Sequence, residues 1–180
     1  MIPVSGPEGL GLLVGWDIRL TRWMNRSLSI RGVQPLFAFV SWLGNGKLWY
    51  ALMLLLPVLA ASGRLISFHL AVVGLVNLLL YKTAKLLSRR PRPCNAYEEI
   101  MRGAVPLDEF SLPSGHTMHA VAFTLIASTY LPILFVPLAI FTVLVAMSRV
   151  VLGLHYPTDV ILGAGIGCLI SKTSFLLLAI

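Results

Sequence analysis

Charged residues are scarce in this chain, and their scarcity excludes an ordinary soluble domain. Only 12% of the 180 residues are Asp, Glu, Lys or Arg, whereas 57% are hydrophobic, and the mean hydropathy is +0.86. Soluble domains carry about a quarter charged residues, because polar side chains must coat their surface. We therefore expect a lipid bilayer to surround most of the protein.

Acidic residues and cysteines are also few. Only 7 Asp and Glu residues stand against 14 Lys and Arg residues, which gives a net charge of +7. The basic residues flank apolar runs and form no continuous water-exposed face, so we expect no nucleic acid partner and favour lipid headgroups or phosphates. Cys94 lies in a polar loop and Cys168 lies deep in the last apolar run. We expect both to be free thiols.

Long apolar runs predict an all-α fold, a polytopic transmembrane helical bundle, because about 20 apolar residues cross a bilayer as a helix. Crossings are expected from about Lys47 to Gly63 and from Leu65 to Leu87. The uncharged stretch from His119 to Met147 is too long for one upright crossing, so we expect two helices that meet at Leu131-Pro132. The last crossing is expected to run from Tyr156 to the C-terminus. The predicted number of crossings is five, with six as the alternative.

The N-terminal region has a different pattern. On a helical wheel an apolar side is formed by Trp16, Leu20, Trp23, Met24 and Leu28, and a basic side by Arg19, Arg22 and Arg26. This pattern predicts an amphipathic helix that lies in the membrane interface. A second apolar piece, Pro35 to Leu43, stops at Gly44-Asn45-Gly46 and is too short to cross alone.

We therefore expect one membrane domain over residues 1–180. Its predicted parts are an interfacial region at 1–46, two transmembrane helices in 47–87, a substrate-side loop at 88–113 and three transmembrane helices in 114–180.

The order of crossings places four polar segments on one side of the membrane. The second crossing ends near Lys85 and Arg92, the third begins at Ser114, the fourth ends at Arg149 and the fifth begins near His155. Lys and Arg are the usual protein ligands of phosphate, and the Arg fork matches two phosphate oxygens. These segments predict a site that handles a phosphate group.

Two further features suit phosphoryl transfer. Ser114-Gly115-His116 directly precedes an apolar helix, whose first backbone N–H groups point at any anion bound there. His155 and Asp159 are four residues apart at the start of the last helix. At that spacing a carboxylate can bind one ring nitrogen and leave the other free as a nucleophile.

Together these segments resemble the three signature motifs of the type 2 phosphatidic acid phosphatase superfamily. In chain order they read Lys85-x6-Arg92-Pro93, Pro113-Ser114-Gly115-His116 and Ser148-Arg149-x5-His155-x3-Asp159. Each motif alone is a weak signal, but three with the right internal spacing at one membrane face are specific. The resemblance covers Lys85 to Asp159, and the surrounding helices fit the membrane-bound branch of that superfamily.

The resemblance implies a metal-independent lipid phosphatase that uses no cofactor. In it, His155 attacks phosphorus and becomes a phosphohistidine, Asp159 orients His155, and His116 protonates the leaving oxygen and then activates water. The residues implied to bind the phosphate are Lys85, Arg92, Ser114, Gly115 and Arg149. The implied substrates are lipid phosphomonoesters or diphosphates, with undecaprenyl diphosphate or phosphatidylglycerophosphate favoured. The alternatives are a lipid-to-lipid phosphotransferase and a non-catalytic protein that binds or transports lipid phosphates.

Several residues allow a plainer interpretation. Lys82 and Arg89 are also seven residues apart, but only the Lys85 frame has Arg-Pro in register. We interpret Lys82, Arg89 and Arg90 as interfacial anchors. The loop acids Glu98, Glu99, Asp108 and Glu109 are interpreted as solvated. No Cys, Asp or Glu lies near the His116–His119 pair in sequence, so no metal site is predicted.

The resemblance and the basic residues disagree on orientation. Lys and Arg are concentrated on the side of the predicted site, which by the positive-inside rule favours the cytoplasm. Membrane members of the superfamily, however, are thought to act on the outer face. We expect an integral protein of a bacterial inner membrane with its site on the extracytoplasmic face. The sequence predicts no oligomeric state.

Overall fold

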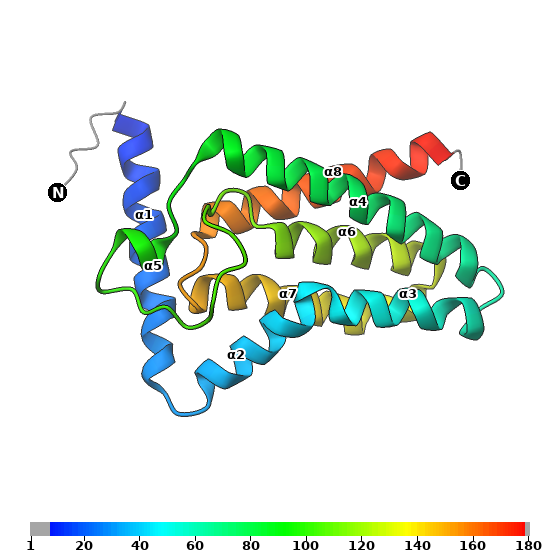
Figure 1. The fold of residues 1–180 in the computed structure, drawn as a ribbon, viewed down its shortest axis with the longest axis horizontal. Helices are drawn as coiled ribbons and strands as arrows, with labels where there is room; N and C mark the ends of the chain where they lie inside the picture. Colours follow the sequence, from blue (N-terminus) through cyan, green and yellow to red (C-terminus); the bar gives the residue numbers. More distant parts are fainter. Residues whose placement is uncertain (1–7, 179–180) are drawn as a thin grey trace.

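The computed structural model describes residues 8–178, which form helices and no β-strand (Figure 1). The N-terminal part comprises α1 (Glu8–Asn25), the short η1 (Arg26–Ser29), α2 (Val33–Trp42), the π-type η2 (Leu43–Lys47) and α3 (Leu48–Leu59). The remainder comprises α4 (Gly63–Ser88), α5 (Pro93–Ala96), α6 (Gly115–Tyr130), η3 (Pro132–Leu134), α7 (Phe135–Val151) and α8 (Pro157–Leu178). The all-helical prediction is confirmed.

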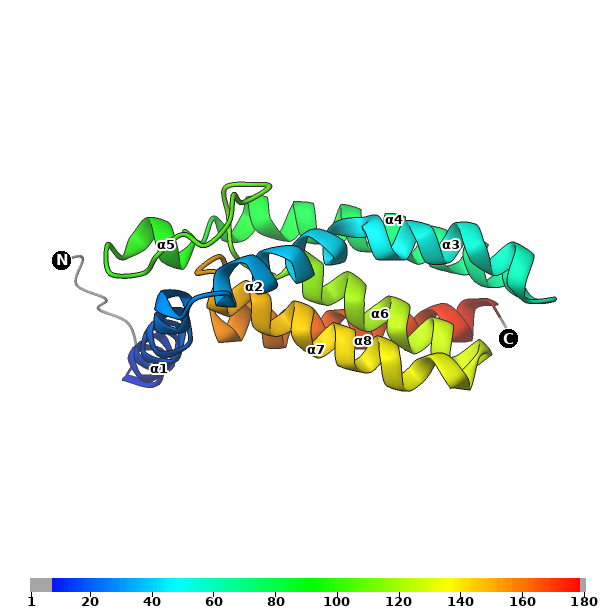
Figure 2. The ribbon, with the colours of Figure 1, turned by 90° about the horizontal axis from the view of Figure 1, so that it is seen from below.

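The long helices lie side by side along one axis, with α6 at the centre of the bundle. Helix α6 packs against α4, α7 and α8, while α3 packs against α4. Seen from below, α3 and α4 lie on one side of α6, and α7 and α8 lie on the other (Figure 2). The core between the helices includes Trp49, Leu70, Phe123, Ile126 and Val145. Many apolar side chains on the outer surface are exposed, as expected for a protein that faces lipid.

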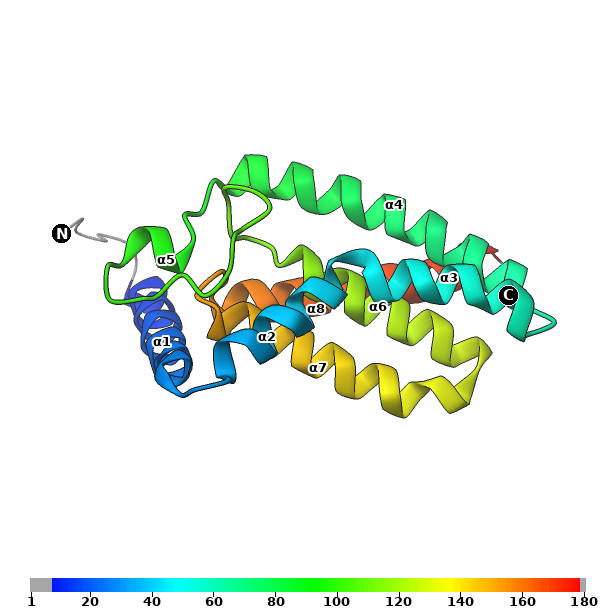
Figure 3. The same ribbon diagram turned by 60° about the horizontal axis from the view of Figure 1, so that its bottom comes forward.

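Four helical segments are long and apolar enough to cross a membrane: Val33–Leu59, Gly63–Ser88, Pro132–Val151 and Pro157–Leu177. Helix α6 has 16 residues. At 1.5 Å per residue it extends about 24 Å, slightly less than the apolar thickness of a bilayer. It nevertheless connects the two ends of the bundle, because α4 ends at the end where α6 begins, and α7 begins at the opposite end (Figure 3).

The first candidate span begins at Val33, earlier than the Lys47 predicted from the sequence. Gly44-Asn45-Gly46 interrupts the helix as predicted, because Asn45 has ψ 42° and Gly46 has φ 95°. The interruption is a kink within one candidate span, since the chain continues from η2 into α3. A positive φ is accessible to glycine without steric cost, which is why this kink is tolerated.

One other sequence prediction about the helices is confirmed. The chain turns at Leu131-Pro132, between the end of α6 and the start of α7. Gly163 and Gly167 bring α8 close to α6, since a Cβ at either position would clash with the carbonyl oxygen of Ser114 or Met118. This close approach sets the first turn of α8 beside the first turn of α6.

Helix α1 lies across one end of the bundle, next to the loop of residues 89–114 (Figures 1 and 3). Its buried face is polar and consists of Asp17, Thr21 and Asn25, whereas Trp16 and Trp23 are exposed. Arg22 pairs with Glu99 and lies over the Tyr97 ring. Of the apolar side predicted from the sequence, Trp16 and Trp23 are exposed, whereas Leu20, Met24 and Leu28 are partly buried. An interfacial position for α1 stays a prediction.

Candidate functional site

The residues predicted to bind phosphate and carry out chemistry gather at the end of the bundle crossed by α1. The end of α4, the start of α6, the end of α7 and the start of α8 all meet there, and the 89–114 loop covers them. A cavity of about 400 Å³ opens at this end. Six of the eight predicted residues line it: Lys85, Arg92, Gly115, His116, Arg149 and His155. The other two, Ser114 and Asp159, are fully buried and do not line the cavity.

Three basic side chains form a buried positive wall of the cavity. Lys85, Arg92 and Arg149 are only 5%, 1% and 3% exposed, whereas Lys82 and Arg89 are exposed and lie outside the cavity. Buried cations cost several kcal/mol each unless anions or hydrogen bonds compensate them. Such a wall suits an anionic ligand, and of the two possible pairs only Lys85 and Arg92 line the cavity.

Asp108 faces this positive wall, although nothing in the sequence separates it from the other loop acids. Its carboxylate accepts hydrogen bonds from Lys85 Nζ at 2.7 Å and from Arg92 Nη2 at 2.6 Å. Burial opposes ionisation of Asp108, but the two cations outweigh burial and lower the pKa of its carboxyl group. The carboxylate thus engages two of the cations that a phosphate would need.

His155 lies at the floor of the cavity, 1% exposed. Arg92 Nη1 donates to the Leu154 carbonyl and lies 3.2 Å from Nε2 of His155. A guanidinium can only donate, so Nε2 accepts and the ring proton belongs on Nδ1. Burial, and then the charges of Arg149 and Arg92, lower the pKa of His155 well below 6.5. The neutral imidazole therefore carries its lone pair on Nε2, the nitrogen that Arg92 contacts.

Asp159 lies behind His155, with Oδ2 3.5 Å from Nδ1 of the imidazole. Pro157 begins α8, and Oδ2 of Asp159 caps this turn by accepting from the Tyr156 backbone N–H at 2.9 Å. The Nδ1–Oδ2 approach is longer than a good hydrogen bond. The geometry places the carboxylate to orient and stabilise a charged imidazole.

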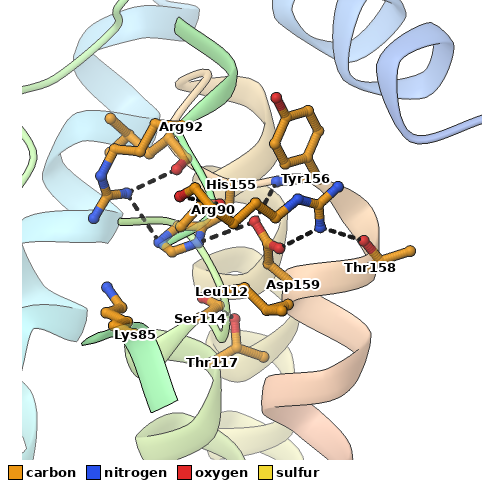
Figure 4. A network of polar contacts seen from close by, with 12 residues as sticks. Lys85, Arg90, Arg92, Leu112, Ser114, Thr117, His155, Tyr156, Thr158 and Asp159 are labelled. Carbon is orange, nitrogen blue, oxygen red and sulfur yellow. Dashed lines mark hydrogen bonds and ion pairs between the residues drawn. The ribbon is translucent and has the colours of Figure 1, made fainter. Parts of the chain in front are cut away.

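Arg90 contacts the other carboxylate oxygen, so its interpretation as an interfacial anchor is wrong. Its Nη1 donates to Asp159 Oδ1 at 2.6 Å and to Thr158 Oγ1 at 2.8 Å, and its plane stacks on the Tyr156 ring (Figure 4). Burial acts against the charged form, but Asp159 and Asp17 outweigh it and raise the pKa of Arg90. A basic residue in a polar loop carries no sequence signal for such a contact.

The N-terminus of α6 forms the wall opposite His155. Ser114 is the N-cap residue and Gly115 the first helical residue, as the sequence suggested. The Ser114 hydroxyl bonds Thr117 Oγ1 at 3.0 Å, and its backbone N–H donates to the Asp159 carbonyl at 3.0 Å. His116 lines the cavity, so the positive end of the helix dipole and an imidazole face the same space.

Metal-ligating residues do not cluster in the described part of the chain. Over residues 8–178, no group of three His, Cys, Asp or Glu side chains has metal-site geometry. His119, the second member of the His-x-x-His pair, is engaged with the carbonyl oxygens of Gly115 and Gly74. Its position is explained by packing between α6 and α4.

The contact of Asp108 with the positive wall leads to a testable prediction. Because its carboxylate competes with phosphate for Lys85 and Arg92, Asp108→Asn is expected to tighten inhibition by inorganic phosphate about three- to tenfold. The matched control is Glu109→Gln, which removes the same charge from an exposed neighbour. Equal effects of the two variants would mean that only the net charge of the loop matters.

Known protein families and sequences include matches to this chain. The profile of the PAP2 superfamily matches residues 66–179. An undecaprenyl-diphosphatase of Sulfolobus acidocaldarius is 28% identical over 165 residues, which cover 89% of this chain and 78% of that protein. Phosphatidylglycerophosphatase B of Bacillus subtilis is 31% identical over 131 residues, 64% of each chain.

Two solved structures share the fold. Aquifex aeolicus LpxE superposes with a TM-score of 0.76 at 24% identity, over 88% of this chain and 93% of its own. A transmembrane PAP2-type phosphatidylglycerolphosphate phosphatase from Bacillus subtilis gives a TM-score of 0.71 at 24% identity, over 91% and 84%. At this identity the likeness concerns the arrangement of helices.

Proposed function

Because this chain belongs to the PAP2 superfamily of phosphatases, we propose that it is a membrane enzyme that removes a phosphate from a lipid through a phosphohistidine. The observation that carries the proposal is a cavity that joins the buried positive wall, His116 and His155 to an apolar groove. A phosphate on a hydrocarbon chain has this same division into a charged end and an apolar end.

The apolar part of the cavity supports a lipid substrate. Its lining comes from α3, α4 and α6 and includes Trp49, Met53, Leu75, Leu78 and Phe123. The groove lies among helices that are long and apolar enough to cross a membrane. The curated relatives named above act on a prenyl diphosphate and a phosphatidylglycerophosphate, which supports these two lipids as the substrates proposed here.

In the proposed reaction, Nε2 of His155 attacks phosphorus and the bond from phosphorus to the lipid oxygen breaks. His116 gives a proton to the leaving oxygen, while Asp159 stabilises the charged imidazole through Nδ1–H. His116 then takes a proton from water, whose oxygen attacks phosphorus and releases phosphate from His155. The phosphate oxygens are held by Lys85, Arg92, Arg149, Ser114 and the Gly115 amide.

The low pKa of His155 predicts the pH dependence of this reaction. The nucleophile is the neutral imidazole, which predominates above its pKa, and that pKa lies below the ordinary 6.5. The acid limb of kcat/KM is therefore expected below pH 6.5. The profile is measured with two lipids of different phosphate pKa, so that substrate ionisation is separated from the enzyme. A limb above pH 6.5 with both lipids would contradict the lowered pKa.

We further propose that α6 completes a set of five membrane crossings and that α1 lies in the interface. The proposed location is a bacterial inner membrane with the cavity open to the extracytoplasmic side. The test uses Glu98→Cys in a chain carrying Cys94→Ser and Cys168→Ser, since Glu98 is exposed in the loop over the cavity. Labelling of intact cells by an impermeant reagent is expected; labelling only after disruption would place the cavity in the cytoplasm.

Phosphate release by the detergent-purified protein, with EDTA present, tests the function directly. The panel is a prenyl diphosphate, phosphatidylglycerophosphate, phosphatidic acid and lipid A. Release from one lipid is expected. Transfer of labelled phosphate to a second lipid without free phosphate would indicate a phosphotransferase. Binding without turnover of any of the four would leave a lipid-phosphate binding protein.

A further inference from the structure

Helix α1 turns a polar stripe toward the bundle. Asp17, Thr21 and Asn25 are spaced one helical turn apart and are all at least 98% buried. Thr21 donates to the Asp17 carbonyl within its own helix. Asn25 binds the backbone of Met101 and Val151. Burying a carboxylate is costly unless it is well paired. The buried carboxylate of Asp17 therefore requires compensating partners.

Both oxygens of the Asp17 carboxylate are engaged near the candidate site. Oδ1 accepts from the backbone N–H of Thr158 at 3.0 Å, and Oδ2 accepts from Arg90 Nη2 at 2.7 Å. The Thr158 hydroxyl donates to Oδ2 as well. Thr158 directly precedes Asp159 in the first turn of α8. Asp17 therefore contacts two residues that themselves adjoin Asp159.

Arg90 is shared between two carboxylates. Nη2 donates to Asp17, while Nη1 donates to Asp159 Oδ1 at 2.6 Å. An Arg fork prefers to bind one carboxylate with both of its ends. In this structure Nδ1 of His155 lies 3.5 Å from Oδ2 of Asp159. Without the charge of Asp17, both ends of the Arg90 guanidinium can bind Asp159 and draw its carboxylate away from His155. The balance between the two acids keeps Oδ2 directed at the imidazole.

We propose that Asp17 is a positioning residue of the phosphatase site: it holds Arg90 and Thr158 and thereby fixes Asp159 behind His155. This inference rests on the function proposed above. Asp17 lies outside residues 66–179, the part of the chain that matches the family profile, and it does not line the cavity. Helix α1 is thus part of the active-site framework as well as a membrane-facing element.

The test compares kcat and KM of Asp17→Asn with wild type on the lipid that wild type hydrolyses. Asparagine keeps the size and the acceptor for Thr158 but removes the charge. We expect kcat to fall about tenfold, because the stabilisation by Asp159 weakens in the transition state. KM should change less than twofold, since Asp17 does not reach the substrate. The control is Thr21→Val on the same helix face, with kcat expected within twofold of wild type.

Coupling to Asp159 separates positioning from mere support of the helix. In an Asp159→Asn background, Asp17→Asn should lower kcat by less than a further twofold, because its effect passes through Asp159. Arg90→Lys cannot bridge both acids, so it should show the same loss of kcat as Asp17→Asn and the same lack of additivity. Arg90→Lys replaces Asp17→Asn in the test if Asp17→Asn does not fold.

Three results would overturn the inference alone, provided that wild type turns over a lipid. They are full additivity in the Asp159→Asn background, unchanged kcat in Asp17→Asn and Arg90→Lys, or an equal loss in Thr21→Val. Failure of wild type itself to release phosphate would instead overturn the proposed function, and this inference with it.

Discussion

His155→Ala is expected to lower kcat by about 10⁴-fold or more, the scale seen when a catalytic nucleophile is removed. Of the other side chains that line the cavity, Lys85, Arg92 and Arg149 are cations, Asp108 is paired with two of them, and His116 is proposed to transfer protons. The measurement is phosphate release under single-turnover conditions, so that slow residual activity is detected. The same loss is expected with EDTA present or absent, since the proposed nucleophile requires no metal.

The matched control removes another buried histidine. His69 lies near the start of α4, at the end of the bundle far from the site, and bonds Tyr130 and Ser174. His69→Gln is expected to lower thermal stability but to leave kcat within a few fold of wild type. If His155→Ala retained more than a tenth of wild-type kcat while folded, His155 would not be the nucleophile.

Arg92→Lys is expected to reduce kcat/KM about 10²- to 10³-fold although the charge is kept. Arg92 uses its three nitrogens at once, on Asp108, on the Leu154 carbonyl and beside His155. The lysine ammonium is a point charge and cannot span these positions. Oxyanion-stabilising donors of this kind are worth about 10²- to 10³-fold in rate.

Arg89→Lys provides the control for Arg92. Arg89 lies three positions earlier and is exposed, so its replacement should change kcat/KM less than twofold. Kinetics of the two variants side by side decide which basic frame binds phosphate. A larger loss in Arg89→Lys than in Arg92→Lys would show that the Lys85 frame is wrong.

The sequence predicted the parts of the site that depend on local spacing. The spacing of seven residues singles out Lys85 and Arg92. The spacing of one helical turn singles out His155 and Asp159. The crossing order then placed these segments at one end, and the structure brings them together. The comparisons confirm that the chain belongs to the superfamily and that it is a hydrolase acting on phosphoric ester bonds. The catalytic roles of the residues stay predictions.

The contacts that the sequence did not predict join residues far apart in the chain. Asp108 looks like the three other loop acids, and only the path of the loop brings it to Lys85. Asp17 reaches Thr158 and Arg90 because α1 lies across the bundle, which no periodicity in residues 8–25 reveals. The sequence predicts the interruption at Gly44-Asn45-Gly46 but not the continuation of the same span beyond it, because a glycine pair marks a helix end and a kink equally well.

Trapping of the labelled intermediate tests the central proposal most directly. Wild type, His69→Gln and His155→Ala are mixed with a lipid that carries labelled phosphate and are quenched in alkali within one turnover. We predict label on the protein that survives alkali and is released by acid, as expected for a phosphoramidate, in the first two proteins and not in His155→Ala. Label that persists in His155→Ala, or that is lost in alkali as an acyl phosphate would be, would contradict it.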